Sequence, residues 1–199
     1  MTEILLTKVC DIGNTNLSII ERKNSIFDIF VKRIYILFTR FRTIKLNNAR
    51  YIFSRYYLIK LTKKLGIYRN FNFCFSHSGK YSAVLFSTDL EGISLDIEYV
   101  GRRLSESLNF KIKTLYADLK VSELLVIMIL ESLVKLSAFN PPVTLLKCLD
   151  RNFPVKISAM KNSVFEVNVN NVIVYSKIYT FQDLHICVTL ESNRFNLSL

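Results

Sequence analysis

Two acidic side chains with one residue between them lie in a β-rich stretch of the chain. A strand is predicted over Ile93 to Glu98, and its alternation places the carboxylates of Asp96 and Glu98 on one face while Ile97 points to the other. Such a pair suits Mg²⁺, which binds a few carboxylates together with waters and substrate phosphates. Acidic pairs are also common on the solvated face of a strand. The pair therefore indicates a metal site only if other residues join it.

A second charged pair lies on a predicted helix that begins after Ser122 and ends near Leu136. Glu131 and Lys135 are four residues apart and share one helix face, where they could also form an ordinary surface ion pair. The rest of this helix is almost wholly apolar, so most of its sides should be buried. Buried charges need partners, because desolvation of an unpaired charge is costly. A metal ion and a phosphate would supply such partners.

The chain has two histidines. His77 lies between two serines just beyond a strand predicted over residues 71–75, and His185 lies within an alternating strand pattern. A lone histidine is more often structural than functional. We interpret His185 as structural, and His77 gains a functional reading only from its context.

The hydrophobic pattern predicts the elements that position these residues. Strands broken at Gly13-Asn14 are predicted near the N-terminus, and a helix over residues 50–65 that Gly66 ends as a C-cap. Residues 102–120 are amphipathic, helical or mixed. The sequence thus has two successive strand-rich portions, each with a long helix, which indicates an α+β architecture. Further strands are predicted over residues 81–87, 93–98, 164–169, 172–175 and 185–190.

Composition limits the class of protein. The chain has 199 residues, of which 50% are hydrophobic, so it can bury a real core and is not a disordered chain. No apolar run is long enough to span a bilayer and no leader is recognised, so we expect a soluble, cytoplasmic protein. The four cysteines are expected to be reduced core residues, since their spacing is neither metal-binding nor disulfide-rich.

The net charge of +11 is unevenly distributed. Residues 1–70 contain 14 Lys and Arg against 4 Asp and Glu, so nearly all of the excess lies in the N-terminal third. A basic field of this kind attracts anions, whether nucleic acid, a membrane surface, a phosphorylated small molecule or an acidic protein. Charge alone does not choose among these partners.

Three short motifs follow one another in the sequence. They read Phe-Cys-Phe-Ser-His-Ser-Gly from residue 73 with Tyr81 after it, Ser-Leu-Asp-Ile-Glu from residue 94, and Glu-Ser-Leu-Val-Lys from residue 131. They resemble the Ser-His-Ser-Gly strand, the Gly-(Ile/Val)-Asp-(Ile/Val)-Glu strand and the Trp-x-x-Lys-Glu-Ala/Ser-x-x-Lys helix of the Sfp-type 4′-phosphopantetheinyl transferase superfamily. The resemblance covers roughly residues 50–142.

The resemblance implies a pseudo-dimer of two similar α/β lobes, each an antiparallel sheet packed on a long helix. A basic, coenzyme A-binding lobe would span residues 1–90, and a lobe with the acidic strand and the Glu/Lys helix would span residues 91–199. The implied reaction is a Mg²⁺-dependent transfer of phosphopantetheine from coenzyme A to a serine of an acyl or peptidyl carrier protein, which releases adenosine 3′,5′-bisphosphate. The implied partners are coenzyme A and an acidic carrier, with neither nucleic acid nor membrane, and the implied state is a monomer.

The resemblance also implies roles for single residues. Mg²⁺ would be held by Asp96, Glu98 and Glu131. Glu131 would also take the proton of the carrier serine, directly or through a water, and Lys135 would pair with the transferred phosphate. The nucleotide part of coenzyme A, above all its 3′-phosphate, would be bound by basic and polar residues of the N-terminal portion. These residues are Arg50, Arg55, Ser76 and His77.

Three positions depart from the motifs. Ser94 stands where the family has Gly, Ile127 where it has Trp, and Leu130 where it has Lys. The implied metal ligands and Lys135 remain, so the sequence predicts an active but divergent enzyme, with a catalytically impaired member as the alternative.

Two further alternatives stay open. The basic and aromatic residues between Arg33 and Arg55 are also typical of a nucleic-acid-binding module. Residues 26–45 could form a basic amphipathic element at a membrane surface, although a core-facing helix or hairpin with solvated basic residues explains them more simply. Neither alternative explains the acidic motifs.

Overall fold

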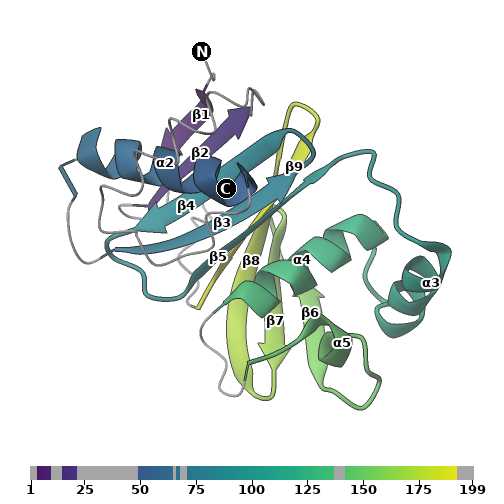
Figure 1. The fold of residues 1–199 in the computed structure, drawn as a ribbon. Coiled ribbons are helices and arrows are strands. Elements are labelled where there is room, and N and C mark those ends of the chain that lie inside the picture. The colour runs from purple at the N-terminus through teal and green to yellow at the C-terminus, as the bar shows by residue number, and fades with distance from the viewer. Residues whose placement is uncertain are drawn as a thin grey trace.

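Two antiparallel sheets and their covering helices make up the computed structural model, which describes residues 4–9, 15–21, 49–64, 66–67, 71–136 and 142–191 (Figure 1). The architecture is therefore α+β, as the sequence predicts. The predicted element at residues 26–45 and Cys10 lie outside the described residues. In the described part of the chain, no helix has the length and apolar character needed to cross a membrane.

The first sheet comes from the N-terminal portion. Its strands are β1 (Ile4–Val9), β2 (Thr15–Glu21), β3 (Asn72–Ser78) and β4 (Tyr81–Ser87), in the order β1-β2-β4-β3. Helix α2 (Ala49–Lys64) packs on β4. Gly66 follows the helix at φ +70°, and its N–H bonds to the carbonyl of Lys63, so it closes the helix as expected of a C-cap glycine.

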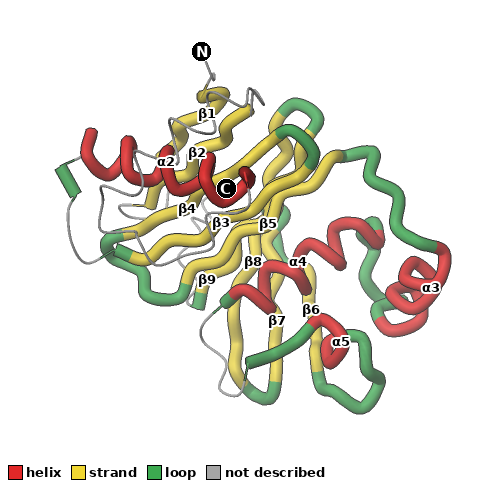
Figure 2. Tube along the Cα trace, in the orientation of Figure 1, coloured by secondary structure: helices red, strands yellow, loops and turns green. Residues whose placement is uncertain are grey.

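The second sheet comes from the C-terminal portion. Its strands are β5 (Ile93–Tyr99), β6 (Val155–Ala159), β7 (Val164–Val169), β8 (Val172–Phe181) and β9 (Leu184–Leu190), in the order β5-β9-β8-β7-β6. Helices α3 (Glu106–Leu115), α4 (Glu123–Lys135) and α5 (Leu145–Cys148) lie on one side of this sheet (Figure 2). Helix α4 is the longest of these three and packs on β5 and β9.

Buried apolar residues form three clusters. One fills the space between α2 and the first sheet, one lies between the two sheets, and one joins α4 to the second sheet. Strand β5 contributes to the cluster between the two sheets. Its residues Ile93, Leu95 and Ile97 join the cluster between the sheets, so the residues in between are turned toward α4.

One predicted strand boundary is wrong in a way that concerns the site. Strand β3 runs through Ser76, His77 and Ser78, whereas the sequence pattern ended it at Phe75. Polar residues continue the strand because each pairs with β4 across the hairpin turn at Gly79, which has φ +50°. A side chain there would also overlap the ring of Tyr99, so the position requires glycine.

Candidate metal and phosphate site

Three carboxylates from two elements meet between β5 and α4. Asp96 and Glu98 of β5 and Glu131 of α4 each place one oxygen within 4.8 Å of the other two. Asp96 is 2% exposed and Glu98 is 8% exposed. The acidic pair is therefore not the solvated face of a strand, and α4 supplies the third carboxylate that the pair by itself lacked.

Small hydroxyl side chains position α4 against the sheet. The Ser94 hydroxyl donates to the backbone carbonyl of Ser132 over 2.6 Å, and the Ser132 hydroxyl lies 2.6 Å from that of Thr189 on β9. The Thr189 hydroxyl also lies 2.7 Å from that of Ser176 on β8. All four residues are buried. Because Ser132 follows Glu131 directly, this network fixes the part of the helix that carries the site.

The bond from Ser94 also explains how the chain accommodates serine where the resemblance has glycine. The last carbonyls of a helix have no partner within the helix. Here the N–H of Leu136 bonds to the carbonyl of Leu133, and the carbonyl of Ser132 accepts from Ser94 instead. The added side chain thus satisfies a buried backbone group at the end of α4.

Lys135 lies beside the carboxylates with all three ammonium protons in use. Its Nζ is 2.7 Å from Oδ1 of Asp96, 3.0 Å from the carbonyl of Leu95 and 3.1 Å from the hydroxyl of Ser76. The side chain is 33% exposed, and these three bonds turn its head group inward. The ammonium therefore balances part of the negative charge of the site.

The two carboxylates of β5 differ in how many of their oxygens have a hydrogen-bond or ion-pair partner. Both oxygens of Glu98 have partners, since Oε2 accepts from Ser78 over 2.7 Å and Oε1 pairs with Arg102. In contrast, Oδ2 of Asp96 is buried and has no hydrogen-bond partner among the described residues. A buried carboxylate oxygen is costly to leave unpaired. An orphaned oxygen in a group of three carboxylates fits a hard divalent cation such as Mg²⁺.

Glu131 has an unusual electrostatic environment. Burial, with a further contribution from the charge of Asp96, raises the pKa of the Glu131 carboxyl above its ordinary value, against the opposing effects of Arg102 and Lys135. Among the described residues, no side chain or backbone group donates a hydrogen bond to this carboxylate. A carboxylate with a raised pKa binds protons more readily, which suits a proton acceptor.

The residues expected to bind coenzyme A are not brought together as one group. Ser76 lies on the face of β3 that meets β5, whereas His77, the next residue, points to the opposite face. Arg55 is buried on α2, with its guanidinium carbon 6.0 Å from the ring centre of Phe75, which shares the face of His77. Arg50 is in α2, but its side chain lies outside the described residues.

The contact of Ser76 with coenzyme A stays a prediction, and in this structure Ser76 is bonded within the protein. Its hydroxyl accepts from the N–H of Ile97 over 3.2 Å and from Lys135, and it donates to Asp96 over 2.9 Å. A serine hydroxyl has one proton and two lone pairs. All of them are used within the protein in this structure.

Sequence reasoning missed Ser78 and Arg102, the two partners of Glu98. The regular spacing offered a signal for Ser78, because Ser76 and Ser78 are two residues apart just as Asp96 and Glu98 are. Arg102 is four residues after Glu98, but it lies beyond the end of β5, so no periodicity relates the two side chains.

The two other departures from the motifs are core positions. Ile127 and Leu130 are fully buried in the cluster between α4 and the second sheet. A lysine at position 130 would place its stem in this apolar layer, away from Glu131. The chain therefore uses these positions for packing, and its cations at the site are Lys135 and Arg102.

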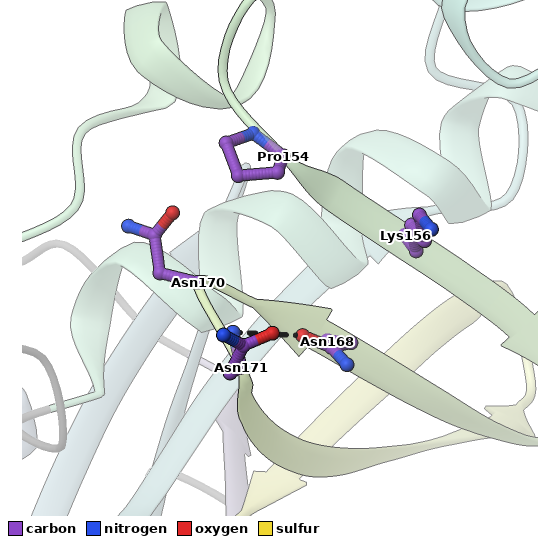
Figure 3. A pocket seen from close by; sticks show the side chains of 5 residues that line it. All are labelled: Pro154, Lys156, Asn168, Asn170 and Asn171. Carbon is purple, nitrogen blue, oxygen red and sulfur yellow. Dashed lines mark hydrogen bonds between the residues drawn. The ribbon is translucent and has the colours of Figure 1, made fainter.

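A cavity near the other end of the second sheet is unrelated to the carboxylates. Pro154, Lys156, Asn168, Asn170 and Asn171 line it (Figure 3). Asn170 and Asn171 have φ values of 51° and 67° and form the two-residue turn between β7 and β8, as expected of asparagines in such a hairpin. Among the described side chains, none of the expected site residues lines this cavity.

The chain was also compared with known proteins. No model of a known protein family matches it, and a search among curated proteins finds no match.

Proposed function

We propose that the chain is a Mg²⁺-dependent 4′-phosphopantetheinyl transferase. It would transfer phosphopantetheine from coenzyme A to a serine of an acyl or peptidyl carrier protein and release adenosine 3′,5′-bisphosphate. The observation that carries this proposal is the convergence of Asp96, Glu98 and Glu131 within 4.8 Å, from β5 and α4. These are the positions at which the motif resemblance implies the metal ligands.

The carboxylates and the lysine take different roles in this proposal. Asp96, Glu98 and Glu131 hold the metal, and bound Mg²⁺ would neutralise charge on the pyrophosphate of coenzyme A. Glu131 also accepts the proton of the carrier serine, directly or through a water. Lys135 exchanges its contact with Asp96 for an oxygen of the transferred phosphate. The partial exposure of the Lys135 side chain supports this role, because the head group can turn outward.

The finer fold and the partners belong to the same proposal. Two sheets, each with a helix on one face, support a pseudo-dimer with lobes at residues 1–90 and 91–199. Arg50, Arg55 and His77 of the first lobe bind the nucleotide part of coenzyme A. The net charge of +11 favours both this ligand and an acidic carrier protein. We expect a cytoplasmic monomer.

A catalytically impaired member of the same family is the second candidate. It is favoured by Ile127 and Leu130, which are core residues where the motif has a tryptophan and a lysine. Such a protein would keep the metal site and bind coenzyme A without completing the transfer.

The deciding experiment is incubation of the purified chain with coenzyme A, Mg²⁺ and a panel of apo carrier proteins, followed by intact-protein mass spectrometry. Transfer adds the mass of phosphopantetheine to the carrier. Asp96→Ala and Glu131→Ala should abolish this gain, and His77→Ala should mainly raise the KM for coenzyme A. Glu106→Ala, at an exposed position of α3, serves as the control and should retain activity. If the folded wild-type chain modifies no carrier, the transferase proposal fails.

A calorimetric titration with coenzyme A separates the two candidates. Mg²⁺-dependent binding without transfer would identify the impaired member. Neither binding nor transfer would exclude both candidates.

A further inference from the structure

Two serines of β3 and two carboxylates of β5 pair one to one across the contact between the sheets. The Ser76 hydroxyl donates to Asp96 Oδ1 over 2.9 Å, and the Ser78 hydroxyl donates to Glu98 Oε2 over 2.7 Å. All four residues are buried. The two serines share a face of β3, and the two carboxylates share a face of β5.

This pairing arises because the free edge of β5 lies against the face of β3. Strand β5 is at the edge of its sheet, so the edge-facing backbone groups of Leu95 and Ile97 pair with no further strand among the described residues. Side chains take the place of that strand: the Ile97 N–H donates to the Ser76 hydroxyl, and the Leu95 carbonyl accepts from the Cys74 thiol and from Lys135. The N-terminal sheet and α4 therefore both donate hydrogen bonds to the edge of the strand that carries the acidic pair.

The hydroxyl proton of Ser76 has one acceptor, Oδ1 of Asp96. Its oxygen already accepts from the Ile97 N–H and from the Lys135 ammonium, so its own proton is directed at Asp96. This fixes Oδ1 of Asp96 on the side of β3 and leaves Oδ2 as the oxygen without a partner. Ser78 restrains Glu98 in the same way through Oε2.

We propose that Ser76 and Ser78 are positioning residues that orient Asp96 and Glu98 for metal binding, so that the N-terminal sheet sets the geometry of a site whose ligands lie in the C-terminal portion. This inference rests on the proposed function, since it deepens the account of the same metal site. It assigns Ser78 a role and gives Ser76 a role other than contact with coenzyme A. Restraint of a ligand by a neighbouring hydrogen bond commonly accounts for a 10–100-fold difference in metal affinity.

The test compares Mn²⁺ affinity among purified full-length variants, measured by electron paramagnetic resonance of free Mn²⁺. Ser78→Ala should weaken binding by about 10–100-fold, and Ser78→Thr, which keeps the hydroxyl, should restore it to within a few-fold of wild type. Ser82→Ala is the matched control, because Ser82 is a fully buried serine of β4 whose hydroxyl has no hydrogen-bond partner in the described part of the chain. Its Mn²⁺ affinity should equal that of wild type. Thermal unfolding without metal checks that each variant is folded.

The outcomes separate this inference from the proposed function. If wild type binds no Mn²⁺, the metal site and the positioning role both fail. If wild type binds Mn²⁺ and Ser78→Ala binds it equally well, only the positioning role is overturned. Should Ser78→Ala not fold, Ser78→Cys takes its place, and a weak thiol donor should give an affinity below that of wild type; an unchanged affinity would overturn the role.

A separate measurement distinguishes the two roles of Ser76. If Ser76 is a positioning residue, Ser76→Ala should weaken Mn²⁺ binding in the absence of coenzyme A. If Ser76 instead contacts coenzyme A, Ser76→Ala should leave the Mn²⁺ affinity unchanged and raise the KM for coenzyme A. That result would overturn the assignment of Ser76 as a positioning residue.

Discussion

Replacement of Lys135 by methionine tests whether an internal cation balances the acidic site. The change keeps the length and apolar character of the stem but removes the ammonium. The buried carboxylate of Asp96 then loses its ion-pair partner at 2.7 Å. We expect the metal-free protein to become less stable, and the site to bind a divalent cation more tightly, because the added cation no longer competes with Lys135.

The size of the effect follows from the geometry. The attraction over 2.7 Å is about 6 kcal/mol at an effective dielectric constant of about 20, and desolvation offsets part of it. Removal of one partner from a buried pair costs about 3–5 kcal/mol. Because the Lys135 side chain is 33% exposed, we expect a loss of about 3 kcal/mol, the lower end of that range. For a chain of 199 residues, this lowers Tm by about 6–12 °C.

Differential scanning calorimetry with and without Mn²⁺ measures both effects. In the presence of a chelator, Lys135→Met should unfold at a lower temperature than wild type, and saturating Mn²⁺ should raise its Tm by more than it raises that of wild type. Lys111→Met, at an exposed position of α3, is the matched control and should leave both values unchanged. An unchanged Tm in chelator, or a weaker response to Mn²⁺ than that of wild type, would refute the balancing role of Lys135.

Three further predictions concern the surroundings of the site. Ser94→Gly removes the donor to the Ser132 carbonyl, so the free energy of unfolding should fall by about 1–3 kcal/mol; urea denaturation measures this, and an unchanged midpoint would show that the bond contributes nothing. Burial raises the pKa of Glu131 above its ordinary 4.5, so ionisation in the folded state lowers stability as pH rises above that value. Glu131→Gln should therefore raise the metal-free Tm at pH 7 and flatten its dependence on pH, whereas a lower Tm at pH 7 would contradict this. Burial raises the pKa of Cys187 from 9.0 to about 12, so at pH 8 its thiolate is about a thousandfold less populated than that of a cysteine with the ordinary pKa. Iodoacetamide should therefore label Cys187 only after unfolding, and peptide mapping measures this.

Much of the candidate site could be predicted from short-range geometry. The alternation of a strand places Asp96 and Glu98 on one face whatever surrounds them, and the turn of a helix does the same for Glu131 and Lys135. The apolar sequence of α4 also predicted correctly that this helix is buried. These inferences hold because each depends on residues within a few positions of one another.

The partners of these charges could not be predicted in the same way. The pairs Ser76 with Asp96 and Ser78 with Glu98 are each separated by 20 residues, and they form only because the edge of β5 meets the face of β3. Neither sheet contains that information in its own periodicity. The pattern even ended β3 before Ser76, because three polar residues do not resemble a strand until β4 pairs with them.

The sequence by itself determined which residue types share a face and in what order the elements occur, because the geometry of helices and strands is local. Only the tertiary structure decided that three carboxylates converge within 4.8 Å and that Lys135 turns its ammonium onto Asp96. The tertiary structure also decided that Ser76 faces the carboxylates and that Leu130 lies in the core. These outcomes depend on how the buried faces of the two sheets and α4 pack together, which is a property of the whole chain.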